Sequence, residues 1–372
     1  MAKRKDKVTA RRRRKRKLIL VIVEIIVLLI LLAGLFVTSK FNLMDRVELN
    51  RDQIQNDSLT EETQATLQGY TDIALFGLDN RNTGNYANGN SDVIMVVSIN
   101  KDTKELAMVS VYRDTYLDVS AKGEDSKFRK ANSAYAYGGA EQAITMLNNN
   151  LDMDIDDYIS FDFEAVADAI DVLGGIEVEL TSAEVKYLNQ YLAETNDIID
   201  GDSNYISSDG LQTLDGAQAV TYARIRSTSG GDFKRAERQR IVIAAALEKA
   251  KTCNLKTLNE LVDVVFPEIE TSMSAATMLQ MVTALMDYDL SESYGFPFER
   301  TTMTHGSKGS LVVPCTLESN VIELHRILYD KENYEPSDLV EKYSEYIMDD
   351  TGKTESSAMD DQFTLDYEED TE

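Results

Sequence analysis

Short apolar runs and helical repeats of apolar residues alternate along the chain from residue 70 onward. Apolar runs of strand length, bounded by Gly, Asn, Asp or Lys, predict buried strands. They occur at residues 73–76, 93–99, 106–111, 158–161 and 176–180. Helical spacing predicts helices at residues 139–150, 164–173, 217–222, 232–251, 275–288, 318–328 and 337–347. The alternation is typical of an α/β fold with a central mixed sheet flanked by helices.

Local signals mark the ends of several predicted helices. Gly174 and Gly175 follow the helix at 164–173 and predict its end. Asp215 and Asp232 are expected to cap the next two helices, and Pro267 interrupts the pattern after them.

Residues 18–37 form an apolar stretch in which seventeen of twenty side chains are Leu, Ile, Val or Phe. As a helix this stretch would be roughly 30 Å long, the thickness of a bilayer core. A cleaved signal peptide is the competing interpretation, but its apolar part is usually about 7–15 residues long and ends at a small-x-small site. The segment LFVTSKFN offers no such site. The stretch therefore predicts a single uncleaved transmembrane signal anchor.

Charge is divided unevenly on the two sides of this stretch. Residues 1–17 contain eleven Lys or Arg and one acid, a net charge of +10, whereas the remaining 27 basic and 63 acidic residues give −36. Because basic flanks stay on the cytoplasmic side, we expect a cytoplasmic N-terminus and an extracytoplasmic domain on the cell membrane. The basic run is read as a topology signal that also attracts anionic membrane lipid, and not as a nucleic-acid site.

Composition divides the rest of the chain. Residues 38–69 are polar and acidic and predict a juxtamembrane stalk, residues 70–250 a catalytic core, and residues 251–348 a helical extension of it. Residues 349–372 contain ten acids and one lysine and predict a disordered tail. Two cysteines, Cys253 and Cys315, exclude a zinc cluster and leave either one disulfide or two thiols.

Carboxylates and arginines recur at the ends of the predicted strands. Asp79 and Arg81 follow the first strand, Asp92 begins the second, and Arg113 and Asp114 follow the third. Ligand sites in α/β sheets lie at strand ends, so these positions can converge. Converging carboxylates favour a divalent cation such as Mg²⁺, which takes few protein ligands and completes its shell with water and phosphate.

A second cluster lies in the segment TYARIRSTSGGDFKRAERQR. Arg224 and Arg226 share a face if this segment is extended. After Asp232, one face of the predicted helix carries Arg235, Arg238 and Gln239. Guanidinium groups bind phosphate in bidentate fashion, and a helix N-terminus adds positive potential for an anion.

Each of these features also has a purely structural interpretation. Asp79 and Asp92 flank Asn- and Gly-rich segments where Asp serves turns. Arg235 alternates with Glu237, as in a solvated face of ion pairs, and Arg113 could pair locally with Asp114. The residues alone predict an anchored extracytoplasmic α/β domain with a metal and phosphate site.

Seven segments, taken in order, resemble the LytR-CpsA-Psr (LCP) family of cell-envelope proteins. They are DIALFGLDNR, SDVIMVVSIN, VYRDTYLDV, KANSAYAYGGAEQAI, FDFEAVADAIDVLGGIEVEL, LDGAQAVTYARIR and GGDFKRAERQR. They cover roughly residues 70–250, and one N-terminal anchor with the domain outside also matches the layout of that family.

The resemblance implies a phosphotransferase that attaches glycopolymers, such as wall teichoic acid or capsular polysaccharide, from polyprenyl-pyrophosphate carriers onto peptidoglycan. It implies an apolar groove beside the sheet for the polyprenyl tail, and Mg²⁺, or Mn²⁺ in its place, as cofactor. The metal-binding aspartates of the family fall on Asp79 and Asp92, and the aspartate that positions metal or activates the acceptor hydroxyl falls on Asp232. Basic and polar residues implied at the pyrophosphate fall on Arg81, Arg113, Lys130, Arg224, Arg226, Arg235 and Gln239.

Two positions depart from the family pattern. Asn90 stands where family members often carry Arg, and Tyr112 stands where they often carry Pro. Two other functions share the same features: a polyprenyl-pyrophosphate pyrophosphatase, with water as acceptor, and a non-catalytic envelope regulator or scaffold.

Overall fold

The computed structural model describes residues 38–78, 86, 89–199 and 201–359. Two compact units divide the chain, residues 1–44 and residues 45–372. Of the first unit, the structure describes a short helical segment, in which the amide of Asn42 donates to the carbonyl of Thr38 at 3.1 Å. The fold described below belongs to the second unit.

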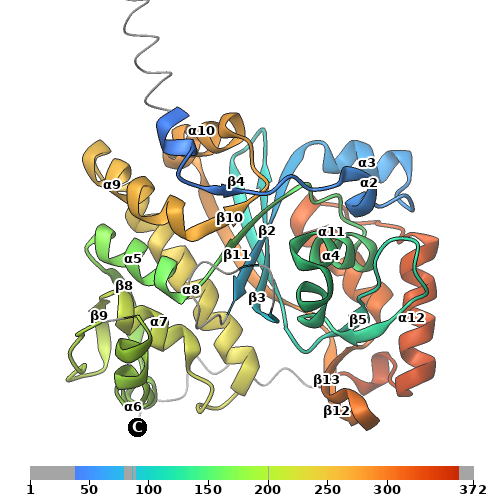
Figure 1. Cartoon of the computed structure of the whole chain (residues 1–372). Coiled ribbons are helices and arrows are strands. Elements are labelled where there is room, and N and C mark those ends of the chain that lie inside the picture. The colour runs from blue at the N-terminus through green and yellow to red at the C-terminus, as the bar shows by residue number, and fades with distance from the viewer. Residues whose placement is uncertain (1–37, 79–85, 87–88, 200, 360–372) are drawn as a thin grey trace, which may run out of the picture. The chain divides into compact units, whose positions relative to one another are not determined.

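A seven-stranded mixed sheet forms the centre of this unit (Figure 1). In spatial order its strands are β1 (Asp45–Arg46), β10 (Ile269–Thr271), β7 (Asp157–Phe161), β2 (Tyr70–Leu78), β3 (Ser91–Asn100), β4 (Glu105–Val111) and β11 (Asp289–Phe296). Three neighbouring pairs are parallel, β1 with β10, β2 with β7, and β4 with β11, and the other three are antiparallel. The mixed sheet predicted from the sequence is therefore confirmed.

Side chains of the central strands point alternately to two buried faces. On β2, Ala74 and Phe76 pack into the main hydrophobic core, whereas Ile73 and Leu75 line a cavity on the opposite face. Burial on both faces explains why these strands are nearly continuous apolar runs that the sequence pattern detects.

Helices cover both faces of the sheet (Figure 1). The main core includes residues of α2 (Arg51–Ile54), α3 (Glu61–Leu67), α4 (Ser133–Leu151), α11 (Leu317–Tyr329) and α12 (Asp338–Thr351). The opposite face is lined by α5 (Phe163–Leu173), α8 (Gly231–Lys251), α10 (Ala275–Ala284) and the 3₁₀ turns η1 (Phe266–Glu268) and η2 (Leu285–Asp287). Helix α9 (Leu255–Val265) packs on α5 and runs into η1.

A smaller layer with its own core extends beside α5 and α8. It contains the antiparallel pair of strands β8 (Ile176–Leu180) and β9 (Gly210–Leu214) and the helices α6 (Ser182–Ile198) and α7 (Gly216–Arg224). Two further two-stranded sheets pair β5 (Tyr116–Asp118) with β6 (Phe128–Lys130) and β12 (Arg300–His305) with β13 (Gly309–Pro314). The short turns η3 (Gly306–Lys308) and η4 (Glu355–Ser357) complete the elements.

Several expectations about chain organisation need correction. Residues 45–69 are not a stalk, because β1 joins the sheet and Ile54, at 1% exposure, lies in the main core. Residues 251–348 are not only helical, since they supply β10 and β11 to the same sheet. The tail begins later than residue 349, because α12 continues to Thr351 and Asp350 pairs with Lys308 at 2.7 Å.

The predicted anchor at 18–37, the basic residues 1–17 and most of the acidic tail lie outside the described residues. Within the described ranges, no helix combines the length and the apolar character needed to cross a bilayer. Cys253 and Cys315 are both free thiols, and Cys315 is buried.

Candidate active site

Charged side chains from distant parts of the sequence meet at one end of the sheet. Asp92 lies at the start of β3, and Arg113 follows the end of β4. Because β3 and β4 are antiparallel, with Met95 opposite Ser110, the start of one strand lies beside the end of the other. The convergence expected from strand ends is therefore found for Asp92 and Arg113.

The start of α8 supplies the other side of the site. Gly230 and Gly231 both have positive φ, 84° and 50°, which lets the chain turn sharply into the helix. Asp232 lies in the first turn of α8 and Arg235 one turn later, while Arg226 follows the end of α7. Gly230, and not Asp232, occupies the N-cap position, so the predicted capping role of Asp232 is wrong and its carboxylate faces other partners.

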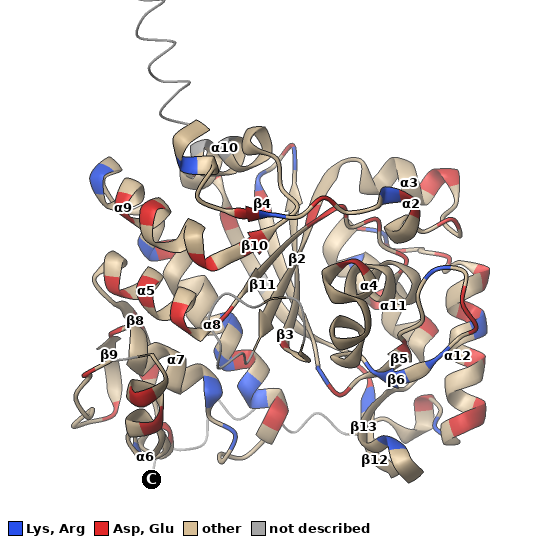
Figure 2. Cartoon of the chain, in the orientation of Figure 1, with Lys and Arg blue, Asp and Glu red and all other residues tan. Residues whose placement is uncertain are grey.

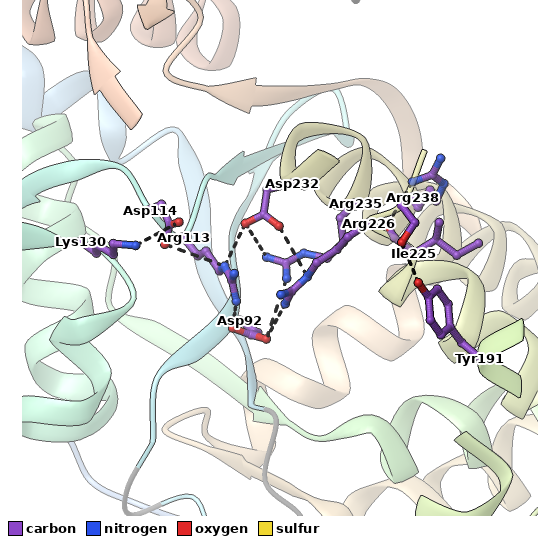
Figure 3. A network of polar contacts seen from close by, with 11 residues as sticks. Asp92, Arg113, Asp114, Lys130, Tyr191, Ile225, Arg226, Asp232, Arg235 and Arg238 are labelled. Carbon is purple, nitrogen blue, oxygen red and sulfur yellow. Dashed lines mark hydrogen bonds and ion pairs between the residues drawn. The ribbon is translucent and has the colours of Figure 1, made fainter. Parts of the chain in front are cut away.

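Two carboxylates and three arginines form a closed network (Figure 3). Arg113 donates from Nη1 to Asp92 Oδ1 at 2.7 Å and from Nε to Asp232 Oδ2 at 3.0 Å. Arg226 Nη2 lies 3.3 Å from Asp92 Oδ2, and its Nε lies 3.5 Å from Asp232 Oδ1. Arg235 Nη2 lies 3.4 Å from Asp232 Oδ2. We call these five residues the charge network.

The charge network has one more positive than negative charge and is partly shielded from water. Arg235 is only 4% exposed, and its Nε and Nη1 atoms make no hydrogen bond within the described residues. Buried guanidinium donors without acceptors are costly unless a ligand supplies acceptors. Burial alone would lower the pKa of Arg113, but the Asp92 charge and hydrogen bond, with Asp232 and Asp114, raise it overall.

Asp114 connects the charge network to another cation. Its Oδ2 lies 3.2 Å from Lys130 Nζ, at the end of β6, and its Oδ1 lies 3.9 Å from Arg113 Nε. The predicted Lys130 therefore contacts the charge network only through Asp114. Figure 2 shows the basic residues at the start of α8 beside the start of β3.

A cavity of about 290 Å³ opens against the charge network. Asp92, Arg113, Asp232 and Arg235 line it, and so does the predicted Gln239. An aromatic wall comes from Tyr112 and Phe233, whose ring centroids lie 4.7 Å apart in an edge-to-face arrangement. Asp114 also lines the cavity, and residues to which the sequence analysis gave no role in the site complete the lining, namely Ile94, Ser110, Val111, Gly230, Gly231, Phe233, Ala236, Thr302, Ser310 and Val312.

The predicted Arg224 is not brought into the charge network. Arg224 donates to Thr195 Oγ1 at 3.3 Å and lies over the ring of Phe163 at 4.9 Å. Arg224 is the last residue of α7, so the helix ends between Arg224 and Arg226 and their two-residue spacing no longer gives them a common face. Asp79 and Arg81 lie outside the described residues. Asn90, where the family often has Arg, is exposed.

Arg238 is a structural residue. Its Nε donates to Glu184 Oε1 at 2.8 Å, its Nη1 to the carbonyl of Ile225 at 3.1 Å and its Nη2 to Thr228 Oγ1 at 2.6 Å. Arg238 is 4% exposed and Glu184 9%. The pair therefore joins α8 to α6 and fixes the segment that carries Arg226.

A second, apolar cavity of about 440 Å³ lies on the sheet face covered by α5, α8 and α10. Its walls are aliphatic, aromatic or Met side chains and Ala, from Ile73 and Val97 on the strands to Val242 on α8 and Met281 on α10. No motif of the sequence identified these residues, because apolar positions on buried elements resemble ordinary core.

The two cavities share structural elements. Gln239 lines the first and Val242 the second, one turn of α8 apart, or about 4.5 Å along the helix axis. On β4, Ser110 lines the first and Met108, two residues away on the same face of the sheet, lines the second. The charged and apolar cavities are therefore arranged in sequence along one helix and one strand.

Comparison with known proteins matches this arrangement to one family. The LytR_cpsA_psr family model matches residues 37–302. A relative from Enterococcus faecalis, named polyisoprenyl-teichoic acid–peptidoglycan teichoic acid transferase TagU, is 30% identical over 218 residues, 58% of this chain and 65% of the relative. The TagU of Bacillus licheniformis is 32% identical over 204 residues, 54% of this chain and 60% of the relative. The match thus spans less than two thirds of these relatives.

A solved structure shows the same fold. The LytR-CPS2A-psr family protein YwtF (TagT) of Bacillus subtilis, with bound octaprenyl pyrophosphate lipid, superposes with a TM-score of 0.53 at 21% identity. The superposition covers 76% of this chain and 99% of that structure.

Arg238 and Glu184 provide a test of structural against functional arginines. Replacing a single partner, Arg238→Met, leaves the Glu184 charge buried without a cation. We expect urea titrations to show a free energy of unfolding that is lower by about 3–5 kcal/mol. The double variant Arg238→Met with Glu184→Met should recover most of that loss, because no charge remains buried. A double variant as unstable as the single one would contradict this assignment.

Proposed function

The chain belongs to the LytR_cpsA_psr family, and from this premise we propose that it is a phosphotransferase that attaches a polyprenyl-pyrophosphate-linked glycopolymer to peptidoglycan. Wall teichoic acid, the polymer in the names of its relatives, is the class of donor that we propose. The observation that carries the proposal is the direct succession, along α8 and β4, of a cavity lined by Arg113 and Arg235 of the charge network and a wholly apolar one. A diphosphate joined to an isoprenoid tail has the same succession of charge and hydrocarbon.

The diphosphate of the donor would take the place of the carboxylates as the partner of the arginines. Arg113, Arg226 and Arg235 carry three charges against the two of Asp92 and Asp232, and Arg235 holds buried donors without acceptors in the described residues. Bidentate guanidinium contacts are strong for phosphate oxygens. Lys130, now paired with Asp114, and Gln239 in the cavity wall extend the set.

The transfer itself needs positioning and charge neutralisation more than covalent chemistry by the protein. The acceptor hydroxyl oxygen attacks the phosphorus that carries the sugar polymer, and the bond from that phosphorus to polyprenyl phosphate breaks. The arginines stabilise the charge that collects on the leaving polyprenyl phosphate. Asp232, once its arginines contact the diphosphate, is placed to accept the hydroxyl proton.

Mg²⁺ fits the donor set in part. Of the two implied ligands, Asp92 is described, and its two oxygens now accept from Arg113 and Arg226. Within the described residues no group of three His, Cys, Asp or Glu is arranged to hold a metal, so phosphate oxygens and water would complete the shell. Bound there with Asp79, Mg²⁺ or Mn²⁺ would supply charge neutralisation at the diphosphate.

Residues 18–37 are proposed as the membrane anchor, with residues 1–17 in the cytoplasm and the folded unit outside the cell. This placement keeps the unit next to a donor whose tail lies in the bilayer.

Replacing Arg113 tests the assignment of the charge network. Because loss of one donor at a developing negative charge costs about 10²–10³ in rate, Arg113→Ala should reduce transfer by that factor. Arg326→Ala, on the exposed face of α11, should transfer polymer at the unmodified rate. Lipid-linked polymer and peptidoglycan serve as substrates, and polymer bound to peptidoglycan and free polymer are both quantified. Release of free polymer alone would show a pyrophosphatase, and full activity of Arg113→Ala would favour a non-catalytic role.

Metal removal tests the cofactor. We expect chelation with EDTA to abolish transfer and added Mg²⁺ to restore it. Loss of a group that merely orients a ligand already costs about 10-fold in metal affinity. Asp92→Asn should therefore raise the Mg²⁺ concentration for half-maximal rate by at least about that factor. Transfer that persists undiminished in EDTA would rule out the metal.

The apolar cavity can be tested by filling it. Ala246 on α8 lines the cavity. Ala246→Phe should weaken binding of a long-chain polyprenyl pyrophosphate by about tenfold, because the larger side chain takes up space that the bound tail needs and forces strain. Ala244→Phe, on the same helix but outside the lining, is the matched control. A fluorescent polyprenyl pyrophosphate measures binding, and equal affinities of the two variants would place the tail elsewhere.

A further inference from the structure

Helix α10 and the first two residues of the turn η2 lie in a part of the chain without charge, which ends at the exposed Asp287. Residues 271–286 contain no Asp, Glu, Lys or Arg, although 27% of the whole chain is charged. No other stretch of the described residues is uncharged over such a length. Figure 2 shows α10 without basic or acidic residues.

One side of this segment forms a wall of the apolar cavity. Met278, Met281 and Val282 of α10, Leu285 of η2 and the following Tyr288 line it. The other side has no cover in the described unit, because Met286 is 64% exposed and Val282, which reaches both the cavity and the surface, is 42% exposed.

A surface helix in water normally places charged or polar residues on its outer side. Helix α10 instead presents Ala275, Ala276 and Val282 outward together with the polar but uncharged Gln280, and Met286 follows on η2. An exposed apolar rim continuous with an apolar cavity indicates a contact surface. Its chemistry fits the hydrocarbon boundary of a bilayer, which is also where an isoprenoid tail resides.

The path of the chain gives an independent reason to favour a membrane. Strand β1 pairs with β10, Arg46 opposite Thr271, and α10 begins four residues after Thr271. The folded unit thus begins at the same sheet edge that leads into α10. Only seven residues, 38–44, separate β1 from the apolar stretch 18–37, and at most about 3.5 Å per residue they reach roughly 25 Å.

We propose that the outward side of α10 together with Met286 of η2, here called the α10 rim, rests in the outer surface of the bilayer, with Asp287 at its polar boundary. Through it the isoprenoid tail passes between the bilayer and the apolar cavity. The inference rests on the proposed function, which supplies the lipid donor. Residues 271–288 contain no Lys or Arg, so the contact depends on apolar burial and is insensitive to salt, unlike a polybasic one.

Tryptophan fluorescence can locate the α10 rim, because the chain contains no Trp. The full chain with Met286→Trp is reconstituted into phosphatidylcholine vesicles with or without bromine on the acyl chains. Tyr205→Trp, at a residue 68% exposed in the segment before β9, is the matched control. We expect brominated lipid to reduce the emission of Met286→Trp at least twofold and to leave that of Tyr205→Trp unchanged, at low and at high salt.

Equal quenching at both positions, or none at Met286→Trp, would overturn the proposal. A blue-shifted emission of Met286→Trp without quenching would also overturn it and would indicate that a second copy of the chain covers the α10 rim. Quenching that disappears at high salt would contradict the apolar nature of the contact.

The contribution of the α10 rim to polymer transfer is measured separately. Met286→Glu should lower transfer about tenfold when the donor lies in vesicles, and should leave transfer unchanged when a short-tailed donor is supplied in detergent. If the unmodified chain transfers from neither donor while Met286→Trp is quenched, the proposed function fails and the membrane contact stands. If it transfers from both and Met286→Trp is not quenched, the membrane contact fails alone.

Discussion

Asp92 and Asp232 are held among three arginines, and this compensation of charge connects β3, the end of β4 and the start of α8. A carboxylate or guanidinium left alone at such partly buried positions would cost several kcal/mol, so each member of the charge network depends on the others. The same mutual dependence allows the arginines to exchange their carboxylate partners for another anion. The diphosphate of the proposed donor has four non-bridging oxygens and two negative charges, as many as two carboxylates. It can therefore take over the arginines without leaving them unpaired, and this releases the aspartates for other partners.

The two faces of the sheet differ in how closely they are packed. One face packs α4, α11 and α12 around Phe76 and Tyr135 as an ordinary close-packed core. The other face keeps an apolar space open between β2, α5, α8 and α10. Close packing on the first face stabilises the fold. This stability offsets the free-energy cost of leaving the second face incompletely filled.

The central strands at 73–76, 93–99 and 106–111 were predictable because burial on both faces leaves little but apolar residues in them. The strand predicted at 176–180 exists but pairs with β9 in the smaller layer, since an apolar pattern does not specify a partner. Strands β10 and β11 were missed. Ile269–Thr271 is too short to show a period, and the sequence of β11 includes Ser and Gly. The convergence of Asp92 and Arg113 followed from strand ends, and the place of Asp232 beside them was implied by the family resemblance. Arg224 and Arg226 diverge because α7 ends between them.

Helix α8 also sets the distance between the charge network and the apolar cavity. Its first turns belong to the charge network and the apolar cavity begins one turn beyond Gln239, so the isoprenoid units nearest the diphosphate always meet the same side chains. Carriers with tails of different total length present identical first units to these turns. Any difference in length falls at the far end of the cavity, beyond Val242 and Ala246. Under the proposed function, the head of the carrier is therefore recognised in fixed register, whereas the length of the tail can vary.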